Sequence, residues 1–468
     1  MPIQSINPTT GEILRTFNEF TPDQIDTALE QAHQAARRWR ATSFAQRAGH
    51  MRALAQGLRS DKARWAGLIT AEMGKPIVEA EAEIEKCAWN CEFYAEYAER
   101  FLAPESVPTS AIESYVEFEP LGVVLAIMPW NFPFWQVFRF LAPALMAGNG
   151  SVLKHASNVP LCALAIEEVV KRAGFPQGLF RTVLVGGSGV AGIIADQRVQ
   201  AVTLTGSSVV GAEVAATAGR HIKKQVLELG GSDPFIVLAD ADLDEAARTG
   251  VRARNQNTGQ SCIAAKRFIV EDAAADAFVA KFAEAVRALR VGDPTDRATN
   301  VGPLARGDLR EDLIRQVDAA RSKGARVVTG GASLNGRGYF YAPTVLDEIT
   351  ADSPVFKEET FGPVAAVIRA PDVDEAVRLA NDSQYGLGAS LWTRDLSRAK
   401  DIAPRIEAGS VFVNAMVVSD PRLPFGGIKH SGYGRELGEF GIREFTNIQT
   451  VCIGSPVGAA AATRAAAE

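Results

Sequence analysis

The sequence predicts an α/β fold in which parallel sheets are covered by helices, and three observations carry this prediction. The 468 residues are enough for two or three domains with a large core. Hydrophobic residues make up 47% and charged residues 22%, which is typical of a globular chain rather than a disordered one. From about residue 120, short apolar runs alternate with helical patterns, as strands and helices do in parallel α/β sheets.

The first hundred residues are expected to be mainly helical. Thr21 and Ser43 are each followed by glutamine three residues later, which is a capping-box pattern, and apolar residues at helical spacing come next. The second of these helical runs should end before the Gly-Lys-Pro at 74–76, and a third should cover roughly residues 77–100.

A β-hairpin is expected next in the chain. From Glu113 the pattern changes: Tyr115, Glu117 and Glu119 alternate with Val116 and Phe118. Pro120-Leu121-Gly122 supplies a turn, and Val123–Met128 is an apolar strand. Helical patterns follow at Leu161–Arg172 and Val209–Ala218. Further strand patterns lie at Ser151–Leu153, Thr182–Val185, Ala201–Leu204, Phe235–Leu238, Phe268–Val270, Arg326–Val328, Val364–Ile368 and Val411–Asn414. We expect two α/β domains with a boundary near residues 229–231.

Charge and cysteine content exclude several classes of protein. A net charge of -6 gives no basic footprint for nucleic acid, so no nucleic-acid partner is expected. No signal-peptide pattern and no apolar stretch of about 20 residues are present, so we expect a cytoplasmic protein without a membrane partner. Five scattered cysteines favour a reducing compartment. Cys87 and Cys91 have helical spacing and are expected to pack within a helix, and no metal site is expected.

Two glycine-rich segments are candidates for binding a phosphate. Residues 187–192 match G-x-G-x-x-G formally, but the acidic residue expected about 20 positions later is absent, so a glycine-rich connection is favoured there. The segment Thr205-Gly206-Ser207-Ser208 is better placed, because it closes a strand and opens a helix. Free amides and the helix dipole at that point would suit a pyrophosphate.

Four more clusters carry the functional prediction: Pro129-Trp130-Asn131-Phe132-Pro133, Leu227-Glu228-Leu229-Gly230-Gly231, Gly259-Gln260-Ser261-Cys262 and Glu358-Glu359-Thr360-Phe361-Gly362-Pro363. Each alone has a structural explanation, such as a turn residue or a buried thiol. Together, and in this order, they resemble the aldehyde dehydrogenase superfamily from about residue 5 to residue 453.

The resemblance implies an aldehyde dehydrogenase-like fold. Residues 1–110 and 125–229 would form a Rossmann-like cofactor domain, and residues 230–428 an α/β catalytic domain. Residues 111–124 and 429–455 would form a small β oligomerisation element, and residues 456–468 are expected to be a disordered tail. Because an apolar unpaired strand edge seeks a partner, we expect a homodimer or a homotetramer.

The chemistry of aldehyde oxidation explains why these residues would belong together. A nucleophile must add to the carbonyl carbon before hydride can leave, and by resemblance Cys262 is that nucleophile. The side-chain amide of Asn131 and the backbone N–H of Cys262 would stabilise the oxyanion. Hydride transfer to a nicotinamide then leaves a thioester, and Glu228 matches the base that activates water for its hydrolysis. This carboxylate favours hydrolysis over acyl transfer to coenzyme A. Ala264 stands where relatives inactivated by oxidation often have a second cysteine, so no local disulfide switch is expected.

The resemblance also implies a nicotinamide dinucleotide as cofactor. The residues expected to contact it are Trp130, Lys154, Ser157, Gly206, Ser207, Glu359 and Phe361. Relatives that prefer NAD commonly have glutamate at the position of Ser157, where its carboxylate repels a 2′-phosphate. Serine beside Lys154 removes this repulsion, so NADP is favoured over NAD. The alternative is that Ser157 only caps the following helix and that NAD binds.

Substrate residues follow from the same comparison. Arg139 and Ser419 match positions that hold a carboxylate in relatives that oxidise succinate semialdehyde, and Trp135 and Phe425 are expected beside them. Gln256 replaces a second arginine that some relatives carry. The expected reaction converts succinate semialdehyde, NAD(P)⁺ and water to succinate and NAD(P)H. If Arg139 only forms a surface ion pair, a broader aldehyde specificity is the alternative.

Two other classes of function stay open as more distant alternatives. One is a non-catalytic binding protein with the same fold, against which the intact Asn131, Glu228 and Cys262 argue. The other is a thiol hydrolase, which is poorly supported because no histidine lies near Cys262 in the sequence.

Overall fold

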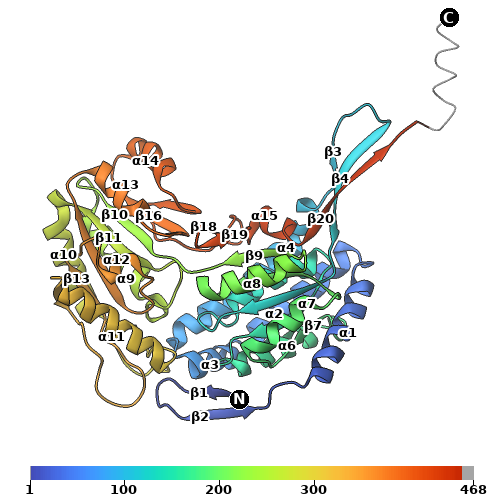
Figure 1. Ribbon diagram of the computed structural model, residues 1–468, viewed down its shortest axis with the longest axis horizontal. Helices are drawn as coiled ribbons and strands as arrows, with labels where there is room; N and C mark the ends of the chain where they lie inside the picture. Colours follow the sequence, from blue (N-terminus) through green and yellow to red (C-terminus); the bar gives the residue numbers. More distant parts are fainter. Residues whose placement is uncertain (1, 456–468) are drawn as a thin grey trace, which may run out of the picture.

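The computed structural model describes residues 2–455 and contains two large sheets and a projecting arm (Figure 1). The expected tail at 456–468 lies outside the described residues. The α/β class with parallel sheets is confirmed. A two-stranded ribbon near the N-terminus precedes the helices and consists of β1 (Ile3–Ile6) and β2 (Ile13–Phe17).

Four helices precede the first large sheet in the chain: α1 (Pro22–Trp39), α2 (Phe44–Ser60), α3 (Lys62–Met73) and α4 (Ile77–Phe101). Both expected capping boxes are present, with Thr21 and Ser43 as the N-caps. The single helix expected after Ser43 is wrong, because the chain leaves helical geometry at Asp61 and continues as α3. Gly74 ends α3 in the left-handed conformation that glycine adopts without steric cost.

The first large sheet has six strands in the order β19-β9-β8-β5-β6-β7, and all its pairs are parallel except β19 with β9. Its strands are β5 (Val123–Met128), β6 (Gly150–His155), β7 (Phe180–Thr182), β8 (Val199–Thr205), β9 (Lys224–Glu228) and β19 (Gly432–Tyr433). The crossovers contain α5 (Trp135–Met146), α6 (Pro160–Arg172), η1 (Gly187–Gly189), α7 (Val190–Ala195) and α8 (Ser208–Arg220). The strand expected at Thr182–Val185 instead ends at Thr182.

The second large sheet has seven strands in the order β12-β13-β14-β11-β10-β16-β17, with only β12 antiparallel to its neighbour. Its strands are β10 (Asp233–Val237), β11 (Ala265–Glu271), β12 (Arg326–Thr329), β13 (Thr344–Asp347), β14 (Val364–Ala370), β16 (Gly388–Trp392) and β17 (Ser410–Val413). Its helices are α9 (Leu243–Asn255), η2 (Gln256–Gly259), α10 (Asp272–Arg287), α11 (Gly307–Ser322), α12 (Pro354–Lys357), α13 (Val373–Asn381), α14 (Leu396–Ile402) and η3 (Ala403–Arg405).

Between β9 and β10 the chain passes from one sheet to the other at residues 229–232. The proposed division into domains at this point remains a prediction.

The arm is a three-stranded antiparallel sheet in the order β20-β4-β3 that projects away from the body (Figure 1). It consists of β3 (Glu105–Ser106), β4 (Glu113–Pro120) and β20 (Thr446–Ile453), and α15 (Gly438–Arg443) precedes β20. The expected hairpin is wrong, because β4 pairs with β20 while β5 pairs with β6 and β8 in the six-stranded sheet. A further short pair joins β15 (Tyr385–Gly386) to β18 (Ile428–Lys429).

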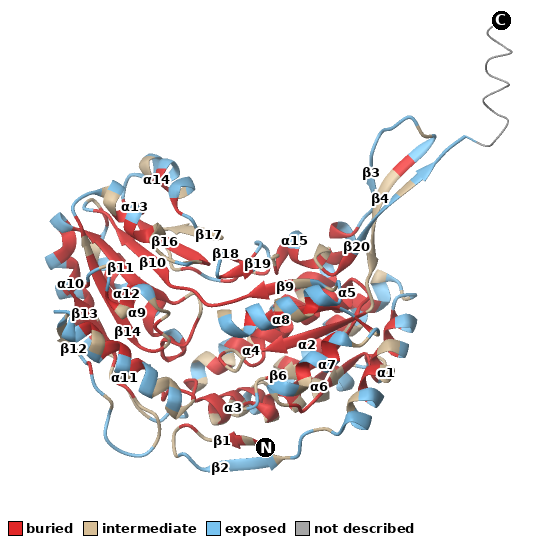
Figure 2. Ribbon diagram, viewed as in Figure 1, coloured by how far each residue is buried: buried red, intermediate tan, exposed pale blue. Residues whose placement is uncertain are grey.

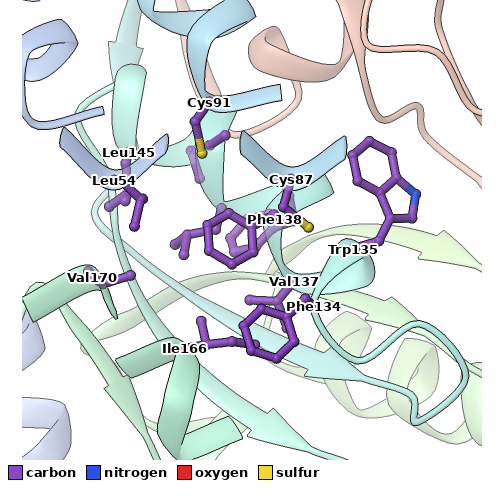
Figure 3. Close-up of a cluster of buried hydrophobic side chains, with 14 of the residues drawn as sticks. Leu54, Cys87, Cys91, Phe134, Trp135, Val137, Phe138, Leu145, Ile166 and Val170 are labelled. Atoms are coloured by element: carbon purple, nitrogen blue, oxygen red, sulfur yellow. The ribbon is translucent and has the colours of Figure 1, made fainter. Parts of the chain in front are cut away.

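The largest core cluster lies where α2–α6 pack together. Buried residues fill the two lobes, one around each large sheet, but little of the arm (Figure 2). Cys87 and Cys91 are both buried members of this cluster, and Cys87 lies near Phe138 (Figure 3), which confirms that they are packing residues of α4. Losing a buried phenylalanine such as Phe138 typically costs about 3–5 kcal/mol. Within residues 2–455, no helix is both long and apolar enough to cross a bilayer, and no three potential ligands cluster as a metal site would require.

Candidate active site

Four strands of the six-stranded sheet bring predicted site residues to one edge. β5, β6, β8 and β9 are parallel, so their carboxyl ends meet at the same edge of the sheet. Trp130 and Asn131 follow β5, Ser157 follows β6, Gly206 follows β8, and Glu228 is the last residue of β9. The strand order turns outward on both sides from the β5–β8 pair, and ligands of open α/β sheets bind outside the carboxyl ends at such a point.

This edge has the donors and charges that a phosphorylated dinucleotide needs. Within residues 2–455, no carboxylate lies within ion-pair distance of the Lys154 ammonium, and burial lowers its pKa. Ser157, three residues further along the chain, is exposed. Ser207 is the N-cap of α8, and its hydroxyl accepts the N–H of Val210 at 3.4 Å. The residues present therefore fit the cofactor that the sequence predicts.

The alternative in which Ser157 only caps the following helix, α6, is wrong. The N-cap of α6 is Val159, which provides no side-chain cap. The carboxylate of Glu72 instead accepts the backbone N–H groups of Leu161 and Cys162 at 2.9 and 2.8 Å. The Ser157 hydroxyl thus has no role at the start of the helix.

The Glu359 loop closes the same region from the seven-stranded sheet. The carboxylate of Glu359 accepts the N–H of Gly231 at 3.0 Å and lies 3.5 Å from the Lys266 ammonium. A Cβ at Gly230 would lie 2.6 Å from a carboxylate oxygen of Glu359, so a larger residue would displace this carboxylate. The rings of Phe361 and Trp130 meet edge to face with centroids 5.7 Å apart, which joins the two lobes at the predicted nicotinamide site.

Cys262 lies in a loop with an unusual backbone between η2 and β11. Asn257 and Thr258 have φ of 56° and Gly259 has φ of 73°, all in the left-handed region. A Cβ at Gly259 would lie 2.4 Å from the carbonyl oxygen of Gly362. The buried guanidinium of Arg254 donates to the carbonyls of Gly259 and Gly362 at 2.6 and 2.5 Å. Arg254 thereby holds the cysteine loop against the Glu359 loop.

The thiol of Cys262 is half-buried, and burial and the nearby positive charges shift its pKa in opposite directions. Burial raises its pKa to about 12, while the positive charges of Arg139 and Lys266 act to lower it. The Lys266 ammonium donates to the Cys262 carbonyl at 2.7 Å and to the Ser261 carbonyl at 3.0 Å. Lys266 therefore both positions this loop and favours the thiolate.

The two groups predicted to stabilise the oxyanion, the Asn131 amide and the Cys262 backbone N–H, each have a hydrogen that no acceptor in residues 2–455 takes. The Asn131 amide donates to the Gln260 carbonyl at 3.1 Å, which uses one of its two hydrogens and leaves the other free. No acceptor within the described chain takes the backbone N–H of Cys262. Asn257 fixes the position of Asn131, because its amide donates to the Asn131 backbone carbonyl at 2.7 Å.

Glu228 is a buried carboxyl group without hydrogen-bond partners. Neither side-chain oxygen has a partner within the described chain, and the residue is 2% exposed. Burial raises its pKa well above the ordinary value, the Arg139 charge opposes this shift, and the Glu436 carboxylate adds to it. An unpartnered carboxyl with a raised pKa is suited to accept a proton from water.

A cavity of about 150 Å³ opens beside Cys262 and contains the predicted substrate residues. At ~30 Å³ per water molecule, this is room for roughly five waters or one small organic molecule. Its wall combines apolar, neutral polar and charged side chains, including Trp135, Arg139, Ser419, Phe425, Gln256 and Lys86.

Arg139 reaches this cavity from α5, but its guanidinium is already engaged. It forms an ion pair with Glu436, donates to the Thr205 hydroxyl at 3.1 Å and lies 4.6 Å above the Phe425 ring. The alternative of a surface ion pair is wrong, because both partners are at most 3% exposed. Glu436 therefore largely balances the positive charge that Arg139 brings to Glu228 and Cys262.

Sequence reasoning did not find several residues that build this site. Lys266 and Arg254 hold the cysteine loop, and Lys86 lies on the cavity wall. Glu83 accepts the N–H groups of Phe134 and Trp135, both at 2.9 Å, and so fixes the start of α5. Glu83 is a charged residue on an otherwise apolar helical face, which was the available signal in the sequence. Its partner Phe134 lies 51 residues away, so the sequence could not identify the contact.

The family model for the "Aldehyde dehydrogenase family" matches residues 1–451. The chain belongs to the aldehyde dehydrogenase family. Similar curated relatives include a probable succinate-semialdehyde dehydrogenase [NADP(+)] of Synechocystis sp., which is 51% identical over 97% of this chain and 100% of its own length. A succinate-semialdehyde dehydrogenase [NADP(+)] of Mycolicibacterium paratuberculosis is 53% identical, and 97% of each chain is covered.

Solved structures agree with this assignment to the aldehyde dehydrogenase family. Gox0499, described for its cofactor and substrate selection, has a TM-score of 0.96 at 43% identity, covering 97% of this chain and 100% of its own. The succinic semialdehyde dehydrogenase of Streptococcus pyogenes, solved with NADP⁺ as the cofactor, has a TM-score of 0.95 at 39% identity with the same coverage. The aldehyde dehydrogenase fold of this enzyme is therefore established.

Proposed function

We propose that this aldehyde dehydrogenase oxidises succinate semialdehyde to succinate with NADP⁺ as the preferred cofactor. The observation that carries the proposal is the single cavity in which Cys262, Arg139 and Ser419 meet. A thiol, positive charge and a hydroxyl on one small cavity suit a short aldehyde with an acidic end. The printed names of the relatives at 51% and 53% identity support the same substrate and cofactor.

In the proposed reaction, residues of this chain add to the aldehyde, stabilise the resulting oxyanion and hydrolyse the thioester. The Cys262 thiolate adds to the aldehyde carbon, and the free amide hydrogen of Asn131 and the Cys262 N–H donate to the resulting oxyanion. The nicotinamide dinucleotide, when bound, accepts the hydride. Glu228 then takes a proton from the water that attacks the thioester on Cys262. Because the pKa values of Cys262 and Glu228 are both raised, kcat/KM should increase with pH through the neutral range.

The carboxyl edge of the six-stranded sheet is the proposed cofactor site. Lys154 and Ser157 would hold the adenosine ribose and its 2′-phosphate, and Gly206 and Ser207 would face the pyrophosphate at the start of α8. Trp130, Glu359 and Phe361 would surround the nicotinamide ribose and ring. The uncommitted ammonium of Lys154 and the exposed Ser157 hydroxyl support NADP⁺ over NAD⁺.

Trp135 and Phe425 would pack against the carbon chain of the substrate, while Ser419 and the charge of Arg139 would face its carboxylate. The paired state of Arg139 also favours a second candidate function, a broader oxidation of short aldehydes, because its charge is largely balanced by Glu436. Comparing succinate semialdehyde with butanal, its uncharged four-carbon counterpart, separates the two functions.

We also propose a cytoplasmic location and a homo-oligomeric assembly for this enzyme. All five cysteines are free thiols, which supports the expected reducing cytoplasmic environment. We expect a homodimer or homotetramer, with the arm as the contact.

The test follows the absorbance of reduced nicotinamide when the purified enzyme meets succinate semialdehyde with NADP⁺ or NAD⁺. Turnover should be faster with NADP⁺ and absent in Cys262→Ala. Ser157→Glu should lower kcat/KM for NADP⁺ at least tenfold relative to NAD⁺, because its carboxylate repels the 2′-phosphate. A higher kcat/KM for butanal than for succinate semialdehyde would overturn the proposed substrate.

A further inference from the structure

Lys86 lies on the wall of the Cys262 cavity and carries an ammonium without a carboxylate partner. It belongs to α4, and its side chain lines the cavity together with Arg139 and Ser419. The ammonium donates to the Ser419 hydroxyl at 2.7 Å and lies 4.1 Å from the centroid of the Trp135 ring. No Asp or Glu within residues 2–455 forms an ion pair with it. Because an ammonium has three donors, it can accept further oxygen partners.

The acidic groups that influence Lys86 are engaged elsewhere. On its own helix, Glu83 forms a buried ion pair with Lys75 and also receives the first amides of α5. On the facing loop, Asp420 pairs with Arg422 at 2.6 Å. Neither carboxylate is therefore free to neutralise the Lys86 ammonium.

The other titratable groups of this wall do not neutralise it either. Glu79 accepts the N–H of Asn257 at 2.7 Å, and burial raises its pKa to about 7. Burial keeps the neighbouring Cys87 thiol protonated by raising its pKa. Arg139, on α5, is balanced by Glu436, and Gln256 brings no charge to the cavity. Lys86 is thus the positive group of this cavity that lacks a negative partner.

We propose that Lys86 and Ser419 bind the carboxylate of the substrate, and that Lys86 sets the preference for an acidic aldehyde. This inference rests on the proposed oxidation of succinate semialdehyde. The Ser419 oxygen already accepts a hydrogen from Lys86, so its own hydrogen is free to be donated to a carboxylate oxygen. A charge-assisted bond from the ammonium supplies the second contact. Arg139 then acts mainly through its pair with Glu436.

A pH dependence of substrate binding follows from this role. Burial and the nearby charge of Arg139 lower the pKa of Lys86 to about 8, and the charges of Asp420 and Glu83 oppose this shift. Above that pH the ammonium loses its proton and its charge. The KM for succinate semialdehyde should therefore rise above about pH 8, whereas the KM for butanal should not follow it.

The experiment compares kcat/KM for succinate semialdehyde with kcat/KM for butanal in the full-length enzyme with NADP⁺. Lys86→Met keeps the length and apolar stem of the side chain and removes its charge, while Lys86→Arg keeps the charge. Lys171→Met is the matched control, because Lys171 is an exposed lysine at the end of α6. We expect Lys86→Met to lower the ratio of the two values at least tenfold through the KM for succinate semialdehyde. Lys171→Met should keep the wild-type ratio.

Lys86→Arg should retain most of the preference and should flatten the rise of KM above pH 8, because arginine stays charged there. The inference is overturned if the wild-type enzyme prefers succinate semialdehyde and Lys86→Met keeps that preference. It is also overturned if the wild-type KM for succinate semialdehyde stays constant between about pH 7 and 9.5. Absence of any preference in the wild-type enzyme would instead refute the proposed substrate itself.

Discussion

Cys262 and Glu228 must each carry a charge in the reaction, although Cys262 is half-buried and Glu228 is buried. The thiol of Cys262 must ionise and the carboxylate of Glu228 must accept a proton, and burial works against the charged form of both. Arg139 and Lys266 provide the opposing positive charge. The enzyme without cofactor therefore keeps Cys262 mostly as the unreactive thiol at neutral pH.

Alkylation of Cys262 tests this consequence. In a Cys452→Ser background the remaining exposed thiol is gone, and Cys87, Cys91 and Cys162 are fully buried. Because the pKa of Cys262 is raised to about 12, the iodoacetamide rate of the cofactor-free enzyme should rise roughly tenfold per pH unit between about pH 7 and 9. Peptide mass spectrometry locates the label. A rate that levels off near pH 7 would mean that the thiolate is already formed in the free enzyme.

The residues predicted from sequence were those in local motifs. Asn131, Glu228 and Cys262 each lie in a short cluster with recognisable chemistry, and their predicted placement at one site agrees with the strand ends and the loop. Lys86 gave no such signal, because its partner Ser419 is 333 positions away and only folding brings the two together. The engagement of Arg139 by Glu436 was hidden for the same reason.

At the scale of single elements, the cysteine loop depends on one glycine. Gly259→Ala would force a side chain into the left-handed region and against the Gly362 carbonyl. We expect it to cost about 1–3 kcal/mol in the free energy of unfolding and to lower kcat, because Cys262 follows three residues later. Urea unfolding and steady-state kinetics measure the two effects.

The matched control for this loop is Gly192→Ala, within the G-x-G-x-x-G segment. A Cβ there meets no atom within 4 Å, and the residue is exposed in α7. Alanine in a helix is typically about 1 kcal/mol more favourable than glycine, so this variant should be at least as stable and fully active. Equal losses in the two variants would contradict the account of the loop.

Helices with complete start signals could be predicted closely, whereas strand partners could not. The capping boxes at Thr21 and Ser43 fix helix starts through contacts three residues apart. Val123–Met128 was recognised as a strand, but its pairing with β6 and β8 depends on segments far along the chain. Local turn chemistry at Pro120 therefore suggested a hairpin that the tertiary pairing of β4 with β20 replaces.

At the scale of the whole molecule, the arm has an open edge: within residues 2–455, no strand pairs with the outer edge of β20. β20 is an edge strand of eight residues, and Ile448 and Ile453 on it are 61% and 45% exposed. An apolar edge of this length is suited to pair with a second copy of the chain. We expect Ile448→Asp to shift the mass measured by light scattering towards the monomer, while the exposed Lys171→Met control keeps the oligomer. A monomeric wild-type enzyme would contradict this role of the arm.

We propose that this aldehyde dehydrogenase oxidises succinate semialdehyde through a thioester on Cys262 that Glu228 helps to hydrolyse. The most direct measurement mixes Glu228→Gln with succinate semialdehyde and NADP⁺ and follows NADPH together with the mass of the Cys262 peptide. We expect a burst of about one NADPH per chain, a succinyl group on Cys262 and little further turnover, because the water lacks its base. Sustained turnover without an adduct, or an adduct on another residue, would contradict it.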